Sequence, residues 1–164
     1  GDFQKLSFEA KEIFGQLESL TKSYNREKSV LFYSQLADLK QKALSISSFN
    51  ESLAAASAIS IAEHSFLYWE NNLAKWMELF KSVGQNDVFG KGSPCDIQPK
   101  HIAGADVAGG VRGGVAGSFL GAAVGAFAGA VIGGAGSSTG AVLWEASKCI
   151  PVIGSVIKWL EDWF

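Results

Sequence analysis

The fold is decided by residues 102–144, which read IAGADVAGGVRGGVAGSFLGAAVGAFAGAVIGGAGSSTGAVLW. Thirteen of the chain's nineteen glycines and eleven alanines fall in this stretch. Seven of the glycines recur at every fourth residue: Gly109, Gly113, Gly117, Gly121, Gly125, Gly129 and Gly133. On a helix this period places them in one nearly straight groove. The stretch therefore predicts a tightly packed helix or helical hairpin, with a neighbouring backbone lying in the groove.

The glycine repeat has an energetic cost that packing must offset. A glycine in a helix interior is less favourable than alanine by about 1 kcal/mol. Seven of them cost roughly 7 kcal/mol on that scale, so the helix cannot stand alone in water. Small residues at this spacing let helices approach closely, in membranes above all. Two other interpretations stay open: a buried helix in a soluble domain, and a glycine–alanine β-stack of cross-β type.

Charge is distributed unevenly along the chain. Of its 164 residues, 48% are hydrophobic and only 18% are charged, and the formal net charge is −2. Residues 1–101 hold 11 basic and 12 acidic side chains, whereas residues 102–164 hold 3 and 4. No charged residue occurs from Gly113 to Trp144. Without a basic surface, we expect no nucleic-acid partner.

The first half of the chain reads as amphipathic helices. Apolar residues at helical spacing predict helices over 3–22, 26–45 and 51–83. The stripes are Leu6, Ala10, Ile13, Phe14, Leu17 and Leu20 in the first; Val30, Tyr33, Leu36, Leu39 and Ala43 in the second; and Leu53, Ala56, Ile59, Ile61, Ala62, Phe66, Leu67, Trp69, Leu73, Trp76, Met77 and Phe80 in the third. Because no strand alternation is visible, the predicted fold class is all-α, a helical bundle.

A loop divides the chain into two regions. Glycine, proline, asparagine and aspartate over residues 84–101 favour turns. The amphipathic region 1–101 therefore ends in a loop, and 102–164 holds the glycine-rich segment and a C-terminal helix. We expect both regions to form one compact domain.

The glycine-rich block is too long to be one straight helix. A helix from Asp106 to Gly133 would measure about 42 Å. We therefore expect a bend, placed by turn chemistry at residues 133–138. Further helices are predicted over residues 139–148 and from Pro151 onward.

Residues that could carry catalysis are few. His64 and His101 are the only histidines, and neither has a second histidine at metal-ligand spacing. The glycines fit neither the dinucleotide fingerprint nor the phosphate-binding loop. We therefore predict a protein that is not an enzyme, with no cofactor and no metal. Asp106 is expected near a helix N-terminus, and Arg112 at the surface edge of the buried segment.

The two cysteines do not decide between an exported and a cytosolic protein. Cys95 and Cys149 could form a disulfide in an exported protein or remain reduced in the cytosol. The chain begins with Gly1 rather than Met, which suggests a processed N-terminus or an expression remnant.

The glycine repeat resembles the glycine-zipper segments of membrane-active proteins and of small secreted, bacteriocin-like proteins. The resemblance covers residues 102–144 and implies an exported protein, secreted, periplasmic or at the cell surface. The predicted arrangement also resembles that of pore-forming bacteriocins, in which amphipathic helices surround a hydrophobic helical hairpin. It departs from the pore-forming colicin type by being shorter and richer in glycine. The sequence identifies no immunity partner.

Two functions of different classes follow from these patterns. The first is a membrane-active, bacteriocin-like or pore-forming protein whose glycine-rich segment inserts in lipid. Trp144, Trp159 and Trp163 would then sit at the membrane interface. The second is a soluble structural or interaction protein that uses the glycine groove as a packing seam or as the seam of a homo-oligomer.

Overall fold

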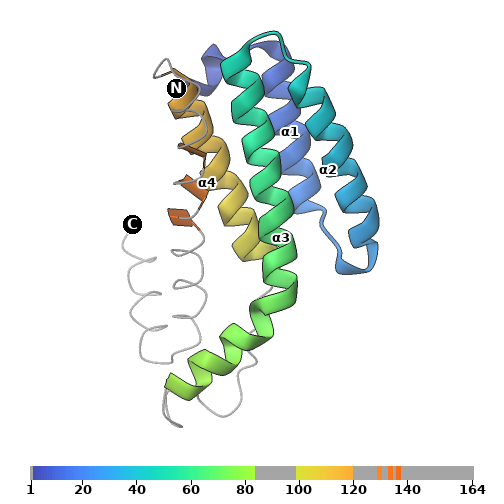
Figure 1. The fold of residues 1–164 in the computed structure, drawn as a ribbon, viewed down its shortest axis with the longest axis vertical. Coiled ribbons are helices and arrows are strands. Elements are labelled where there is room, and N and C mark those ends of the chain that lie inside the picture. The colour runs from blue at the N-terminus through green and yellow to red at the C-terminus, as the bar shows by residue number, and fades with distance from the viewer. Residues whose placement is uncertain (1, 84–98, 120–128, 131–132, 135, 138–164) are drawn as a thin grey trace, which may run out of the picture.

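The protein is an all-α bundle. A computed structural model describes residues 2–83, 99–119, 129–130, 133–134 and 136–137, and among these there are four packed helices and no strand (Figure 1). The helices are α1 (Phe8–Lys22), α2 (Ser29–Leu44), α3 (Phe49–Val83) and α4 (Pro99–Phe119). Short 3-10 turns, η1 (Asp2–Lys5) and η2 (Arg26–Lys28), precede the first two. The all-α prediction is confirmed.

Side-chain caps fix where the first helix begins. The hydroxyl oxygen of Ser7 accepts a hydrogen bond from the backbone N–H of Ala10 at 3.2 Å. This is the N-cap arrangement that satisfies an otherwise orphaned helix donor. Ser7 in turn donates its backbone N–H to a carboxylate oxygen of Glu51 at 3.1 Å, and its hydroxyl to the other oxygen. The start of α1 is thereby joined to the first turn of α3.

Large side chains fill the core between α1, α2 and α3. Leu17, Leu36 and Phe66 are almost fully buried. Phe66 contacts Phe32 and Tyr24, with ring centroids 4.8 and 4.4 Å apart. These aromatic contacts join α3 to α2 and to the connection that precedes it.

Two residues of the predicted stripes face solvent. Val30 is 85% exposed and Leu67 is 48% exposed. In α2 the buried apolar residues are Phe32, Leu36, Leu39 and Ala43. Phe32 shares the buried face of the helix with Leu36 and Leu39, whereas Val30, two positions earlier, lies about 200° around the axis and faces solvent.

The fourth helix begins earlier than predicted. Pro99, Lys100 and His101 lie in α4, so the loop expected over residues 84–101 is wrong at its end. Proline suits the first turn of a helix, because its missing N–H would have no partner there. Residues 84–98 lie outside the described part of the chain.

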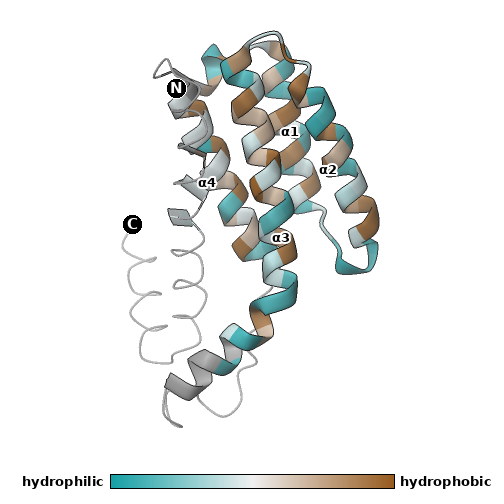
Figure 2. Ribbon diagram, in the orientation of Figure 1, coloured by the Kyte–Doolittle hydropathy of each residue, from teal (hydrophilic) through white to brown (hydrophobic). Residues whose placement is uncertain are grey.

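α4 packs mainly against α3 and also contacts α1 and η1. It runs antiparallel to α1 (Figure 1). Much of α4 is pale in the hydropathy colouring, whereas α1, α2 and α3 carry strongly hydrophilic and hydrophobic residues (Figure 2). Glycine and alanine therefore replace the large side chains as the packing surface of this helix.

Candidate functional site

Two stretches of the glycine repeat face each other backbone to backbone. A Cβ atom added at Gly113 would overlap the carbonyl oxygen of Gly129, and one added at Gly129 would overlap that of Gly113. Gly109 and Gly133 show the same reciprocal overlap with each other's carbonyl oxygens. Only glycine fits at these four positions. We call the contact between them the glycine seam.

The seam runs antiparallel. Moving four residues forward in α4, from Gly109 to Gly113, moves the partner four residues back, from Gly133 to Gly129. The chain direction is therefore already reversed at Gly129. The break predicted at residues 133–138 is wrong in place, because Gly133 itself belongs to the seam.

A second set of glycines, which the four-residue repeat did not include, faces α3. A Cβ atom added at Gly110 would lie 2.9 Å from the Cδ1 atom of Ile61, and one at Gly134 would lie 3.3 Å from its Cγ2 atom. A Cβ atom at Gly114 would lie 3.6 Å from that of Ala54. The Ile61 side chain thus reaches both glycine stretches.

The sequence signal for this second set is the glycine doublet. The doublets are Gly109–Gly110, Gly113–Gly114 and Gly133–Gly134. In each, the first glycine lies in the seam and the second lies against Ile61 or Ala54 of α3. Adjacent residues of a helix are about 100° apart around its axis. Two adjacent glycines therefore leave two faces of the same helix without side chains, so a neighbour can approach closely on each.

Asp106 anchors α4 to α3. Its side chain is 7% exposed and accepts hydrogen bonds from the hydroxyl of Ser65 and from the indole N–H of Trp69, the latter at 3.3 Å. The expectation of a helix N-terminal position is wrong, because α4 begins seven residues earlier, at Pro99. A buried carboxylate needs such donors, since burial without them is costly. Arg112 is exposed, as predicted.

The remaining predicted site residues divide into two groups. Gly117 is buried and its Cα atom would lie 3.5 Å from a Cβ atom at Gly129, which places it at the seam. The others lie outside the described residues: Gly121, Gly125, Trp144, Trp159, Trp163, Cys95 and Cys149.

A groove with a volume of about 880 Å³ lies between α1 and α4. Apolar side chains from both helices and η1 line it, among them Phe3, Phe14, Val107 and Val111. Its other lining residues are mostly cationic or small: Lys11, Gly15, Glu18, Thr21, Lys22, Lys100, His101, Gly104, Ala108 and Arg112. Gly104 lies against Thr21, so the start of α4 is beside the end of α1. We call this hollow the α1–α4 groove.

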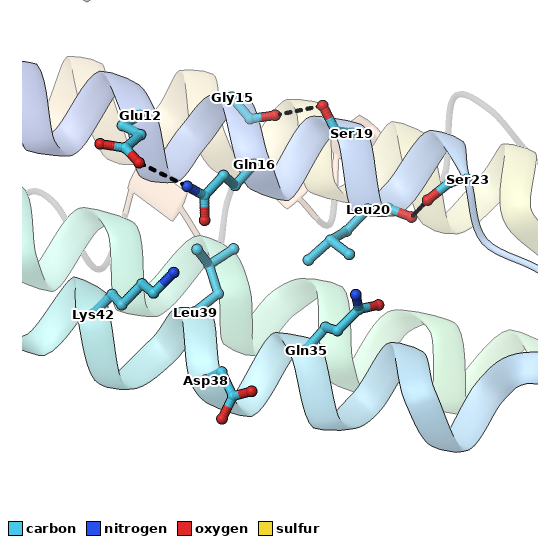
Figure 3. A pocket seen from close by; sticks show the side chains of 10 residues that line it. All are labelled: Glu12, Gly15, Gln16, Ser19, Leu20, Ser23, Gln35, Asp38, Leu39 and Lys42. Carbon is cyan, nitrogen blue, oxygen red and sulfur yellow. Dashed lines mark hydrogen bonds between the residues drawn. The ribbon is translucent and has the colours of Figure 1, made fainter.

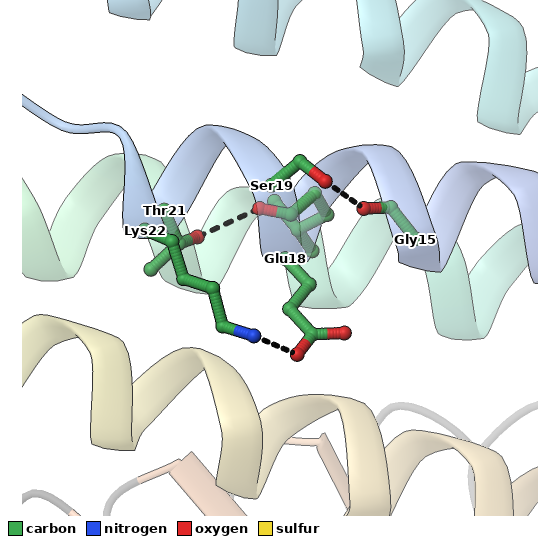
Figure 4. Close-up of polar contacts among 6 residues, drawn as sticks. Gly15, Glu18, Ser19, Thr21 and Lys22 are labelled. Atoms are coloured by element: carbon green, nitrogen blue, oxygen red, sulfur yellow. Dashed lines mark hydrogen bonds and ion pairs between the residues drawn. The ribbon is translucent and has the colours of Figure 1, made fainter.

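One anion lies among these cations. Glu18 and Lys22 form an ion pair with 2.7 Å between the carboxylate oxygen and the ammonium nitrogen. Figure 4 shows both side chains extending from α1 on the side of α4. The hydrogen bond from Lys22 and its positive charge hold the pKa of Glu18 below its ordinary value. Glu18 therefore stays ionised and neutralises part of the cationic rim.

The hollow between α1 and α2 has a different character. Its lining includes the acidic side chains of Glu12 and Asp38, the basic side chain of Lys42 and the amide of Gln16 (Figure 3). Gln16 donates a hydrogen bond to Glu12 at 2.9 Å on the same helix. Such mixed polar walls are typical of a hydrated surface between helices.

Titratable chemistry in the described part of the chain is limited. Burial raises the pKa of Glu70, whose carboxylate accepts a hydrogen bond from the Tyr33 hydroxyl at 3.1 Å. Burial, and secondarily the charge of Glu63, raises the pKa of Tyr33. His64 and His101 are exposed. No group of three or more histidine, cysteine, aspartate or glutamate side chains that could hold a metal ion occurs among the described residues.

Hydrophobic length is also limited in this part of the chain. None of the helices formed by the described residues combines the length and the apolarity needed to cross a bilayer. α4 itself carries Lys100, Asp106 and Arg112 within its 21 residues.

Comparison with known proteins gives no relative. No family model, no curated protein and no solved structure matches this chain.

Proposed function

We propose that this is an exported, membrane-active protein of the bacteriocin-like or pore-forming kind, whose glycine-rich segment 102–144 enters lipid as a helical hairpin. In the folded bundle, α1 and α3 cover the part of the segment that the structure describes. On a membrane, the segment would leave that cover while its two legs stay packed together.

The observation that carries the proposal is the reciprocal fit at the glycine seam. Gly109 and Gly113 contact Gly133 and Gly129 within the same segment, so each leg provides the packing partner of the other. Backbone-to-backbone packing does not depend on water, and small residues serve it in lipid as well. The hairpin can therefore exchange its surroundings without losing its internal contact.

The contact with α3, on another side of the hairpin, is the one that insertion must open. Gly110, Gly114 and Gly134 meet α3 through Ala54 and Ile61. The hydrogen bonds to Asp106 are a polar connection between α3 and α4. Release must break that connection and expose the α3 surface, whereas the seam can remain closed.

A reversible lock between α3 and α4 tests this movement. The Cβ atoms at positions 54 and 114 would lie 3.6 Å apart, which matches disulfide geometry. The variant carries Ala54→Cys and Gly114→Cys in a background with Cys95→Ser and Cys149→Ser. Dye release is measured from vesicles of phosphatidylglycerol and phosphatidylcholine. The oxidised variant should release little dye, and a reductant should restore release.

The controls separate the lock from the substitutions. Each single cysteine variant should release dye whether or not reductant is present. If the protein with all four native residues releases no dye from these vesicles, the membrane function is excluded. If the oxidised variant releases dye as fast as the reduced one, the segment does not leave α3 during the process.

A soluble interaction protein is the second candidate, and one surface feature favours it. Phe8, Leu44 and Phe49 are 79%, 57% and 70% exposed. They lie at the start of α1, the end of α2 and the start of α3, which meet at one end of the bundle (Figure 1). Large exposed apolar side chains at one end of the bundle suit an association surface. Phe8→Ser with Phe49→Ser should then abolish self-association in light scattering, and a monomeric parent protein would contradict this candidate.

A further inference from the structure

We propose that the α1–α4 groove binds one anionic phospholipid, with an acyl chain along the apolar floor and the phosphate bound by Lys100, at the end of the groove that Lys22 also lines. The inference rests on the proposed function in that a membrane supplies the ligand. It adds a specific binding site on the folded protein, separate from the glycine seam, that would hold lipid before the segment inserts.

The floor of the groove suits a hydrocarbon chain. Phe14 and Val107 are buried beneath it, Val111 is half-buried, and none of them carries a hydrogen-bonding side chain. Gly15 and Gly104 line it without side chains and so leave it open. The volume of about 880 Å³ lies within the range of small-molecule sites, about 300–1,000 Å³.

The cations gather at the two ends of the groove. α1 and α4 run antiparallel (Figure 1), and Gly104 lies against Thr21, so Lys22 and Lys100 line one end of the groove and Lys11 and Arg112 line the other. The spacing from Lys100 to Arg112 along the helix is about 18 Å. Lys22 is paired with Glu18, whereas Lys100 and Arg112 have no ion-pair partner among the described residues, so Lys100 is the cation available to a phosphate at its end of the groove.

This distribution favours a lipid over an acidic peptide. A protein with a net charge of −2 still presents four fixed positive charges and one carboxylate around this groove. An acidic amphipathic helix would need cations along its whole length, whereas the middle of the groove is apolar. A phosphate on a hydrocarbon chain needs a cationic end and an apolar floor, and Lys ammonium groups bind phosphate well.

The test uses a phospholipid that is soluble as a monomer, so that binding is measured without a membrane. The wild-type protein is titrated with dihexanoyl phosphatidylglycerol and with dihexanoyl phosphatidylcholine, followed by the NMR signals of the Val107 and Val111 methyl groups. Phosphatidylglycerol should bind more tightly. Lys100→Gln should weaken its binding about tenfold, the loss expected for a charge-assisted contact.

Three further variants locate the site. Ala108→Glu places a carboxylate at an exposed position of the lining and should abolish binding, while Ala108→Gln, of equal size, should bind more tightly than Ala108→Glu. Arg112→Gln, at the other end of the groove, should weaken binding less than Lys100→Gln. Lys42→Gln lies outside the groove and should leave binding unchanged. Circular dichroism confirms the fold of each variant.

The outcomes discriminate clearly. Equal binding of the two lipids, equal loss in Lys42→Gln and Lys100→Gln, or no methyl shift would each overturn the proposal, as would binding of an acidic helical peptide but no lipid. Dye release reports on the membrane function separately. Lipid binding without dye release would support the lipid site in the groove and exclude insertion of the segment. Dye release without binding of the monomeric lipid would support insertion and exclude the lipid site.

Discussion

Two regions of the molecule pack helices by opposite means. Between α1, α2 and α3, large side chains such as Leu17, Leu36 and Phe66 interlock and are almost completely buried. At the glycine seam, Gly113 and Gly129 bring two backbones together with no side chain between them. The first contact removes much apolar surface from water, whereas the second gains from close van der Waals approach.

The difference predicts how each region responds to its solvent. Burial of large apolar groups is favourable because water is excluded, so this force fades when lipid replaces water. Close backbone packing retains its dispersion contacts in either medium. One chain therefore combines a core that depends on water with a seam that does not, and substitutions can separate the two.

The largest effect is expected from the water-dependent core. Phe66→Ala removes a fully buried ring that contacts Tyr24 and Phe32. Such a truncation should lower the free energy of unfolding by about 3–5 kcal/mol. Chemical denaturation followed by circular dichroism measures this loss. A change below about 1 kcal/mol would show that the described core is not the source of stability.

The seam should tolerate not even a methyl group. Gly113→Ala places a Cβ atom on the Gly129 carbonyl oxygen, and this overlap should cost about 1–3 kcal/mol despite the gain in helix propensity. The matched control is Gly15→Ala, because Gly15 is also helical but has no atom within 4 Å of an added Cβ. That control should raise stability by about 1 kcal/mol. Equal effects of the two substitutions would mean that no seam exists.

The polar anchor should contribute an intermediate amount. Asp106→Ala leaves the Ser65 hydroxyl and the Trp69 indole N–H without this acceptor. Loss of an acceptor for buried donors costs about 1–3 kcal/mol. A double-mutant cycle with Ser65→Ala measures the coupling in unfolding free energy. Additive losses would contradict a direct interaction between the two side chains.

The smallest effect concerns pH. Burial raises the folded-state pKa of Glu70 above its ordinary value of 4.5, so the folded protein binds more protons than the unfolded chain over that interval. Its contribution to stability is therefore lost as pH rises from 4.5 through the raised pKa. Glu70→Gln should gain stability relative to the parent between pH 4 and pH 7. Denaturation midpoints at both values give the comparison.

A control of opposite sign sharpens this test. The pKa of Glu18 is lowered by Lys22, so its contribution appears as pH rises and is lost in acid. Glu18→Gln should therefore lose stability relative to the parent over the same range, to a small extent because the pair is exposed. If both variants shift in the same direction, a general charge effect explains the data.

Periodicity predicted the helices well but placed their ends poorly. The stripe of α1 was correct from Ala10 to Leu17, because its residues share one helix face and are buried, and Leu6, which precedes the helix, is buried as well. Val30 was wrong, because it lies about 200° around the helix from Phe32, which occupies the core. Pro99 marked a helix start that turn composition had assigned to a loop.

The sequence by itself determined that the glycine repeat needs a neighbouring backbone, because seven helical glycines are otherwise too costly. It also determined that this segment carries almost no charge. Only the tertiary structure decided what fills the groove at Gly109 and Gly113, namely Gly133 and Gly129 of the same chain. It alone assigned Asp106 to a buried contact with α3 and placed Lys22 and Lys100 along the same groove. The reason is physical: periodicity fixes which residues share a helix face, but the partner of that face is fixed by how the chain reverses and packs.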